Sequence, residues 1–286
     1  MVIDIKGHSG CSVQVRREGH DLFLYKSTQD KAYFERLVLQ AEKQKKASEV
    51  EYQHIRVPHI FEIKEGKDET FIKMEYVYSK NFIEHFESAG FEQINYFIKA
   101  IIWFIDKELA QCSIRTVKHN VILEKFQDVQ KKISSNPLCQ DEQIKRFLTQ
   151  SEEIFNKLED MTMPVGLCHG DLTFSNILFN GNNYYLIDFL DSFIESPLMD
   201  IVKIRQDSSY LWSLLMSNIS YDNIRLRIIA DAIDAKVHQY YNQFPWYKNY
   251  YQHLQLMNFL RVLQYAKTPS VITYLKNVLS QLTHAF

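Results

Sequence analysis

Three oxygen-bearing side chains near the middle of the chain have the types and spacing that phosphoryl transfer requires. Asp171 and Asn176 lie five residues apart in the run HGDLTFSNIL, and Asp188 follows in the run YYLIDF. The transition state of phosphoryl transfer spreads negative charge over oxygens, so catalysis consists mainly of positioning and charge stabilisation. One carboxylate must face the acceptor hydroxyl, and two further oxygen ligands must hold Mg²⁺ against nucleotide phosphates.

A loop followed by a hairpin can bring these three side chains to one point. The loop between Asp171 and Asn176 lets both side chains point in the same direction. Asn176 then begins a predicted strand, NILF, which turns at an Asn-Gly dipeptide into YYLID. Asn-Gly between apolar runs is a strong hairpin signal. The hairpin returns the chain to its starting end, which predicts that Asp188 lies beside Asn176. The alternative is that His169 and Asp171 only cap a turn.

The motif HGDxxxxN, followed by an aspartate on a strand, resembles the catalytic segment of aminoglycoside phosphotransferases and their choline kinase-like relatives. Protein kinases carry the related HRDxxxxN and DFG motifs. The resemblance implies that Asp171 is the catalytic base, that Asn176 and Asp188 bind Mg²⁺, and that ATP or GTP is the phosphoryl donor. The glycine of DFG is absent, because Leu190 and Asp191 follow Phe189 here. Asp191 is either a metal or substrate contact or a solvated turn residue.

The first 80 residues predict a small lobe of strands and one helix. Short segments with alternating apolar and polar residues, bounded by glycines, predict strands at 2–6, 12–17 and 21–26. A polar run follows whose apolar residues recur at the spacing of one helical face, namely Phe34, Leu37, Val38 and Ala41. Two further strands, HIFEIKE and TFIKMEYV, are joined by a Gly-Lys-Asp turn.

The resemblance implies that this lobe carries the residues that clamp the nucleotide phosphates. Lys26, at the end of the third strand, is predicted to contact the α- and β-phosphates as a point charge. A carboxylate on the following helix would orient it, and the spacing favours Glu42 over Glu35. The segment GHSGCSV only partly resembles a glycine-rich loop, and there the backbone N–H groups of Ser9, Gly10 and Cys11 would contact phosphate oxygens.

The segment FIKMEYV resembles the hinge that binds the adenine base in kinase-like proteins. Met74 would line the base pocket, while the carbonyl group of Glu75 and the N–H group of Val77 would pair with the base edge. A lobe boundary falls just after this segment, so we expect a nucleotide-clamping lobe at 1–78 and a catalytic and substrate-binding lobe at 79–286.

The remainder of the chain predicts helices. Apolar residues recur at helical spacing in 92–110 and 141–159, and Ser196-Pro197 has the cap-then-proline pattern of a helix start. Between 165 and 190 the runs VGLCHGD, NILF and NYYLIDF are strand-like. The predicted fold class is therefore α+β and bilobal, similar to protein kinases, with a small antiparallel-sheet lobe containing one main helix and a larger, mostly helical lobe.

The acceptor is predicted to be a small molecule that carries a hydroxyl group, such as an amino sugar, a sugar or an amino alcohol. Only eleven residues separate Asp188 from Asp200, which leaves little room for a peptide-docking segment. Asp200 is interpreted as a structural residue in the first turn of a helix. The alternatives are a protein kinase-like regulator and a nucleotide-binding pseudokinase. Acidic and aromatic residues after 197 offer surroundings for an amine or a sugar ring.

Composition excludes several other classes of function. The net charge is −2, which lacks the basic excess of nucleic-acid-binding proteins. No apolar run reaches the length of a membrane span, and the N-terminus does not resemble a signal peptide. We therefore expect a cytoplasmic protein that binds neither nucleic acid nor membrane.

Overall fold

The computed structural model describes residues 2–6 and 11–286. The chain forms two compact units, one made of Met1–Lys107 and His169–Asp191, the other of Glu108–Cys168 and Ser192–Phe286. The segment with the HGDxxxxN motif therefore packs in the same unit as the N-terminal strands. This division into units does not test the lobe boundary expected between residues 78 and 79, which stays a prediction.

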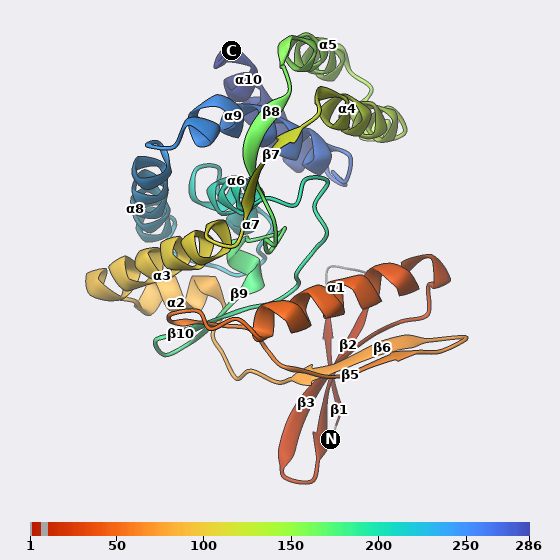
Figure 1. Cartoon of the computed structure of the whole chain (residues 1–286), viewed down its shortest axis with the longest axis vertical. Helices are drawn as coiled ribbons and strands as arrows, with labels where there is room; N and C mark the ends of the chain where they lie inside the picture. The colour runs from red at the N-terminus through yellow and green to blue at the C-terminus, as the bar shows by residue number, and fades with distance from the viewer. Residues whose placement is uncertain (1, 7–10) are drawn as a thin grey trace. The chain divides into compact units, whose positions relative to one another are not determined.

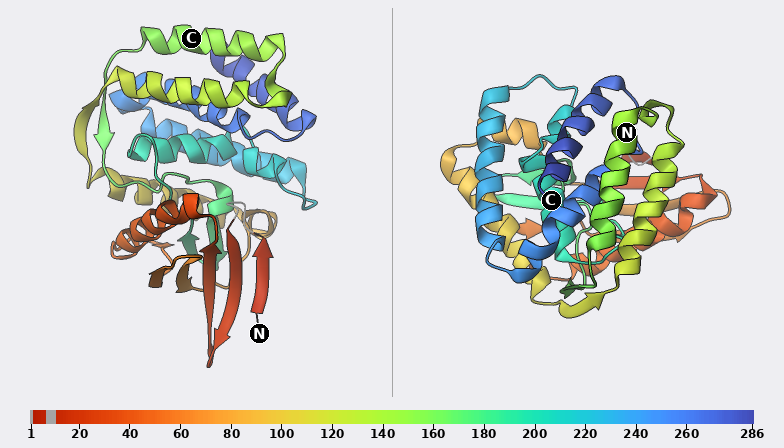
Figure 2. Two further views of the ribbon diagram at one scale, coloured as in Figure 1. Left: turned by 90° about the vertical axis from the view of Figure 1, so that its right-hand side faces the viewer. Right: turned by 90° about the horizontal axis from the view of Figure 1, so that it is seen from above.

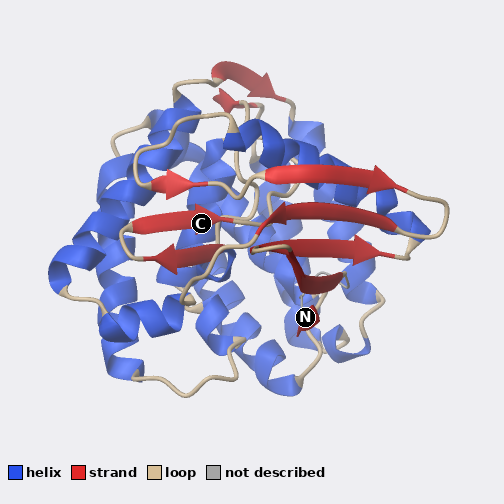
Figure 3. Ribbon diagram, turned by 90° about the horizontal axis from the view of Figure 1, so that it is seen from below, coloured by secondary structure: helices blue, strands red, loops and turns tan. Residues whose placement is uncertain are grey.

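A five-stranded antiparallel sheet forms the N-terminal part of the first unit (Figures 1 and 3). Its strands are β1 (Val2–Lys6), β2 (Ser12–Glu18), β3 (Asp21–Thr28), β5 (Ile60–Glu65) and β6 (Thr70–Glu75), in the order β1-β2-β3-β6-β5. Each neighbouring pair runs antiparallel. The five strands predicted from the sequence are confirmed.

Helix α1 (Phe34–Ser48) packs along this sheet through its apolar face (Figure 1). Leu37 and Ala41 of the helix join Ile60, Ile72 and Met74 of the strands in one buried cluster. Removing a side chain such as Leu37 from water stabilises the fold by about 1.5–3 kcal/mol. The helical spacing read from the sequence therefore identified the face of α1 that meets the sheet.

The rest of the first unit surrounds a three-stranded sheet with strand order β4-β10-β9. Its elements are β4 (Ile55–Arg56), α2 (Phe82–Ser88), α3 (Phe91–Leu109), β9 (Ile177–Asn180) and β10 (Asn183–Leu186). Strands β9 and β10 form the predicted hairpin, whereas β4 runs parallel to β10. Strand β4 was not predicted, because two residues are too few for an alternating pattern.

The second unit consists mainly of helices. Its elements are β7 (Ser113–Val117), α4 (His119–Ser134), α5 (Glu142–Lys157), β8 (Met161–Val165), α6 (Pro197–Ser208), α7 (Trp212–Leu215), α8 (Asn223–Tyr241), α9 (Pro245–Leu263) and α10 (Pro269–His284). Helix α9 packs against α4, α5, α6 and α10 (Figure 2). Ser196 caps α6 by accepting a hydrogen bond from the Leu198 N–H group, as the Ser-Pro pattern predicts.

The strand predicted for the run VGLCHGD, just before the motif, is mostly wrong. Strand β8 ends at Val165, so most of the run VGLCHGD is loop and not strand. Strand β8 pairs antiparallel with β7, which the sequence did not indicate. Strand β7 has the pattern SIRTV, whose side chains are mostly exposed, so it lacks the apolar alternation that a sequence reading depends on.

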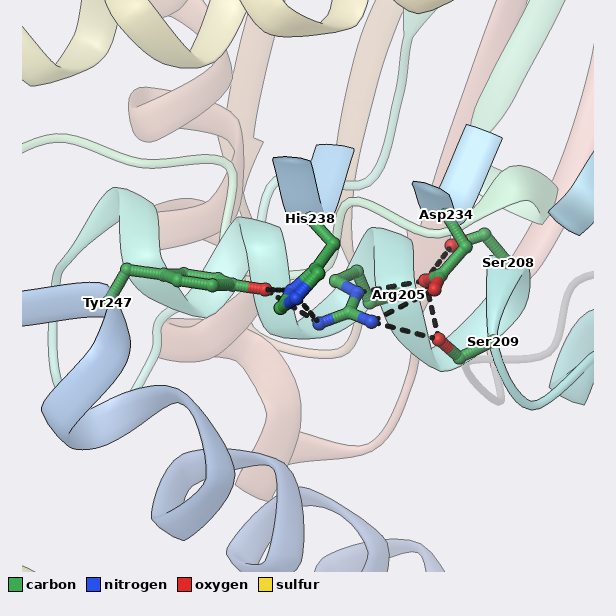
Figure 4. A network of polar contacts seen from close by, with 6 residues as sticks. All are labelled: Arg205, Ser208, Ser209, Asp234, His238 and Tyr247. Atoms are coloured by element: carbon green, nitrogen blue, oxygen red, sulfur yellow. Dashed lines mark hydrogen bonds and ion pairs between the residues drawn. The ribbon is translucent and has the colours of Figure 1, made fainter. Parts of the chain in front are cut away.

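A buried ionic network joins three helices of the second unit (Figure 4). The guanidinium group of Arg205 on α6 forms two hydrogen bonds to Asp234 on α8, at 2.8 and 2.9 Å. Arg205 also donates to the hydroxyl group of Tyr247 on α9 at 2.6 Å. Ser208 donates to the same Asp234 carboxylate at 3.1 Å. These contacts compensate the buried charge of Arg205 where α6, α8 and α9 meet.

Within the residues described, no helix has the combination of length and apolar character that crossing a bilayer demands.

Candidate active site

The catalytic motif begins with a carboxylate and an amide that bond to each other. The side-chain Nδ2 of Asn176 donates to Oδ2 of Asp171 at 3.0 Å and to the Asp171 carbonyl oxygen at 2.8 Å. The chain between the two residues ends in a short 3₁₀ helix, Phe174–Asn176. The loop predicted from the five-residue spacing therefore brings Asp171 and Asn176 together.

The hairpin then brings the third predicted residue to the same place. In the β9–β10 register Leu186 lies opposite Ile177. One step beyond the ladder, the Ile187 N–H group donates to the Asn176 carbonyl oxygen at 3.1 Å. Asp188 follows directly and adopts a left-handed backbone with φ of 61°. This conformation is rare for a residue with a side chain and is enriched at functional sites.

Lys26 forms an ion pair with Asp188. Its Nζ lies 2.7 Å from Oδ1 of Asp188, and the Lys26 side chain is only 8% exposed while that of Asp188 is 43% exposed. Burial disfavours the charge on Lys26, but the attraction and hydrogen bond from Asp188 outweigh it and raise the pKa of Lys26. Lys26 therefore stays positively charged at neutral pH, beside a carboxylate that solvent reaches.

His169 connects the two parts of the motif. Its Nε2 lies 2.9 Å from the Ile187 carbonyl oxygen, and its Nδ1 accepts a hydrogen bond from the Asp171 N–H group at 3.2 Å. These partners assign the neutral tautomer with the proton on Nε2. Burial of the ring lowers the pKa of His169 to about 4, so this tautomer persists at neutral pH. The imidazole thereby holds residues 171 and 187 at a set separation.

The two predicted magnesium ligands suit that ion chemically. Mg²⁺ prefers oxygen ligands and is commonly held by one or two protein groups together with substrate phosphates and water. Because the amide nitrogen of Asn176 donates to Asp171, its oxygen is the atom left to face a cation. Within the described residues no group of three or more His, Cys, Asp or Glu side chains is placed to hold a metal.

The carboxylate predicted to orient Lys26 does not contact it. Glu42 is exposed on α1, and so is the alternative, Glu35. Among the described residues, no hydrogen bond or ion pair joins either one to Lys26, whose ion-pair partner is Asp188. The buried residue at this point of the helix is the next one, Lys43. Spacing along the sequence could not distinguish neighbouring positions that a helix turns to different faces.

The predicted phosphate-covering residues Ser9 and Gly10 lie outside the described residues. Cys11, which follows them, is buried in the cluster between α1 and the sheet.

The predicted hinge residues lie at the end of β6 and just beyond it. Met74 is 7% exposed and belongs to the core cluster, while Glu75 and Val77 are half-buried. The Glu75 N–H group donates to the His59 carbonyl oxygen at 2.9 Å, and the Glu75 carboxylate accepts from the His59 N–H group at 3.1 Å. These bonds fix the end of β6 against the residue that precedes β5, and the predicted contacts of Glu75 and Val77 with a base stay predictions.

A cavity of about 570 Å³ opens beside this strand end, between the C-terminal end of α1 and β10. Glu75 is part of its lining, together with Tyr52, Arg56 and Tyr185. Neither Lys26 nor the three motif residues line it. The cavity is therefore separate from the group of contacts around Asp188.

Several of the acidic and aromatic residues after 197 are buried or have structural partners. Asp222 caps α8 by accepting from two backbone N–H groups, and Asp207 accepts from both the backbone and the hydroxyl group of Ser213. Tyr241 is fully buried, and Asp200 is fully buried in the first turn of α6. Asp191, by contrast, is exposed.

The family model described as "Phosphotransferase enzyme family" matches residues 119–222, which include the whole HGDxxxxN motif and Asp188. This match and the fold confirm the resemblance found in the sequence. No curated protein sequence matches the chain.

Solved structures of aminoglycoside phosphotransferases share the fold over the whole chain. The GDP and kanamycin complex of APH(2")-IIia has a TM-score of 0.64 and 14% identity, and covers 100% of this chain and 93% of that one. A ternary complex of a thermostable APH(4)-Ia mutant with ADP and hygromycin B has a TM-score of 0.63 and 9% identity, with coverage of 99% and 93%. Amicoumacin kinase hAmiN with AMP-PNP, Ca²⁺ and Ami has a TM-score of 0.60 and 10% identity, with coverage of 99% and 88%. The predicted bilobal kinase-like fold class is confirmed.

Proposed function

We propose that this chain, which has the fold of aminoglycoside phosphotransferases, moves the γ-phosphate of ATP or GTP to a hydroxyl group of a small molecule. The observation that carries the proposal is one connected set of contacts. Lys26 pairs with Asp188, the backbone of Ile187 bonds to Asn176, and Asn176 bonds to Asp171. A cation, two candidate metal ligands and a candidate base are thus assembled from three separate parts of the chain.

Each of these residues has a distinct part in the proposed reaction. Lys26 supplies a fixed positive charge for the phosphates, and its burial strengthens that interaction. Asn176 and Asp188 would hold Mg²⁺, which, when bound, neutralises charge on the transferred phosphoryl group. Asp171 accepts the proton of the acceptor hydroxyl as the oxygen attacks phosphorus. The hydrogen bond from Asn176 holds the Asp171 carboxylate in one orientation.

For the nucleotide we keep the sequence-based assignment. The neighbouring structures contain ADP, AMP-PNP or GDP, which supports a nucleotide co-substrate and leaves either base open. Met74, Glu75 and Val77 would contact the base, and the backbone of Ser9 and Gly10 would contact the phosphates. Glu42 would orient Lys26 only if α1 rotated about its axis when the nucleotide binds.

A small acceptor remains the proposed class. Residues 189–196 are all that separates Asp188 from the start of α6, so a peptide-docking platform has little chain to form from. The neighbours named above carry kanamycin, hygromycin B or Ami. An amino sugar, a sugar or an amino alcohol would fit that chemical range. Use of a nucleoside triphosphate agrees with a cytoplasmic protein.

The test is an acceptor screen on the purified chain with Mg²⁺ and ATP or GTP. Amino sugars, sugars, choline-like amines and hydroxy-amino acids would be offered, and release of nucleoside diphosphate measured. With an active acceptor, Asp171→Asn should lower kcat by roughly 10²–10⁴-fold, the scale of a lost general base.

Asp68→Asn is the matched control, because the Asp68 side chain is 95% exposed in a turn of the same unit. It should retain full turnover. Undiminished kcat in Asp171→Asn would remove Asp171 from the mechanism. Phosphate found only on a protein partner, with no small acceptor used, would favour a protein kinase-like regulator instead.

A further inference from the structure

Helix α1 places a second buried lysine near the motif, which the proposed function has not used. Counted over the whole residue, Lys43 is 7% exposed, comparable to Lys26 at 6%. Its neighbour Glu42 is exposed, because one residue turns an α-helix by about 100°. A buried ammonium group is costly unless strong hydrogen bonds compensate it, so its partners must be found close by.

Lys43 donates to the backbone just after Asp188. Its Nζ lies 2.6 Å from the Leu190 carbonyl oxygen, a short charge-assisted hydrogen bond. The other side of the same residue bonds to the catalytic loop, since the Leu190 N–H group donates to the His169 carbonyl oxygen at 2.9 Å. Leu190, which lies two residues after Asp188, therefore links α1 to the segment that carries Asp171.

Gly170 packs against this link. Its backbone has a φ of +85°, and a Cβ atom there would lie 2.0 Å from the Leu190 carbonyl oxygen and 3.4 Å from Nζ of Lys43. The carbonyl group that Lys43 binds therefore occupies the space of a missing side chain. Only a glycine permits this approach. The ammonium group, the carbonyl group and the glycine backbone meet at one tightly packed point.

We propose that Lys43 is a positioning residue that locks the segment after Asp188 against the His169–Asp171 loop, and so sets the separation of Asp188 and Asp171. This rests on the proposed function. A side chain at 43 without a hydrogen-bond donor would leave the Leu190 carbonyl group without this bond. Residues 188–190 would then lose one of the three contacts described above, the others being the Lys26–Asp188 ion pair and the bond from the Leu190 N–H group to His169. Lys43 acts through backbone and does not touch the phosphates.

Two readouts test the proposal in Lys43→Met, which keeps the length and apolar stem but removes the charge and donors. Without ligand, amide hydrogen exchange of peptides covering 186–192 should accelerate about tenfold or more relative to wild type. In turnover assays kcat should fall about 10–100-fold, while KM for the Mg²⁺-nucleotide changes less than about threefold. Lys46→Met, an exposed lysine on the same helix, should match wild type in both.

Unchanged exchange at 186–192 in Lys43→Met would overturn the proposal whether or not the chain proves to be a kinase, because that readout needs no substrate. A large rise in KM with unchanged kcat would also overturn it, since Lys43 would then be a phosphate contact. If the wild type does not bind nucleotide, the proposed function is wrong. The hydrogen-exchange result at 186–192 would still test the role of Lys43, because it is measured without ligand. If Lys43→Met does not fold, Lys43→Leu, which also removes the charge and the donors, takes its place in both assays.

Discussion

His169 illustrates how much of the motif's geometry depends on one uncharged ring. The imidazole is fully buried, packs 4.3 Å from the ring of Phe189 by centroid distance, and bonds on both nitrogens to backbone. A protonated ring would have a second N–H group facing the Asp171 N–H group. The neutral form is therefore part of the folded structure, and its protonation in the unfolded chain couples folding to pH.

We predict that stability falls as the pH is lowered from about 6.5 to about 4. In that window the unfolded chain binds a proton at residue 169, with an ordinary pKa near 6.5, whereas the folded chain, with a pKa of about 4, does not. The contribution is complete above pH 6.5 and amounts to about 3 kcal/mol, at about 1.4 kcal/mol per pKa unit. Denaturant unfolding at several pH values measures it.

The matched variants are His169→Gln and His20→Gln, the latter at an exposed position. The first should flatten the slope between pH 6.5 and 4 and also lower stability at pH 7. The second should leave the slope unchanged. Some slope remains in His169→Gln, because burial also lowers the pKa of His85 to about 4. Equal slopes in wild type and His169→Gln would show that the buried imidazole does not set the pH dependence.

Among the elements, α6 carries the structural core of the second unit. Its residue Arg205 is paired with Asp234 of α8, and its guanidinium group lies 4.5 Å from the ring centre of Tyr251 on α9. The attraction and hydrogen bonds from Arg205 hold the pKa of Asp234 below its usual value in spite of burial. The two charges depend on each other, since either one alone would be a buried charge without an opposite charge beside it.

Removing one partner of this pair should be strongly destabilising. We expect Arg205→Met to cost about 3–5 kcal/mol of unfolding free energy, because it leaves the Asp234 carboxylate buried and unpaired. Arg227→Met removes an exposed i,i+4 pair with Asp231 on α8 and should cost less than about 1 kcal/mol. Chemical denaturation of both variants makes the comparison. Equal costs would mean that the buried network contributes no more than a surface pair.

On the scale of the whole molecule, the motif segment is inserted into the N-terminal unit. Residues 169–191 cluster with 1–107, although 61 residues of the other unit, Glu108–Cys168, separate them along the chain. Lys26, Asp171, Asn176 and Asp188 all lie in this first unit. A ligand held by these four residues would therefore stabilise the first unit directly.

We predict that Mg²⁺ with ATP or GTP slows amide hydrogen exchange mainly in the first unit, in peptides covering β3, β6 and residues 169–191. At a ligand concentration 100 times Kd, a bound ligand stabilises the native state by about 2.7 kcal/mol. Peptides from α4 and α5 serve as internal references and should change little. Nucleotide with a chelator should protect less, and Asp188→Asn should lose the metal dependence. Protection confined to the second unit would contradict this placement of the nucleotide.

The sequence by itself determined the local parts of this protein. Alternation and helical spacing predicted the five strands of the first sheet and the face of α1, because these patterns report directly which side chains meet a core. The Asn-Gly turn and the motif spacing predicted the hairpin and the approach of Asp188 to Asn176, since both depend on residues close together along the chain.

Tertiary structure alone decided the contacts between distant segments. Strand β4 exists only because β10 lies beside it, and β7 only because β8 pairs with it. The partner of Lys26 is Asp188, which lies 162 residues away, and not the Glu42 that spacing favoured. The residue of α1 that bonds beside the motif is Lys43. A one-residue difference on a helix reverses which side chain is buried, and only packing against the rest of the unit determines that rotation.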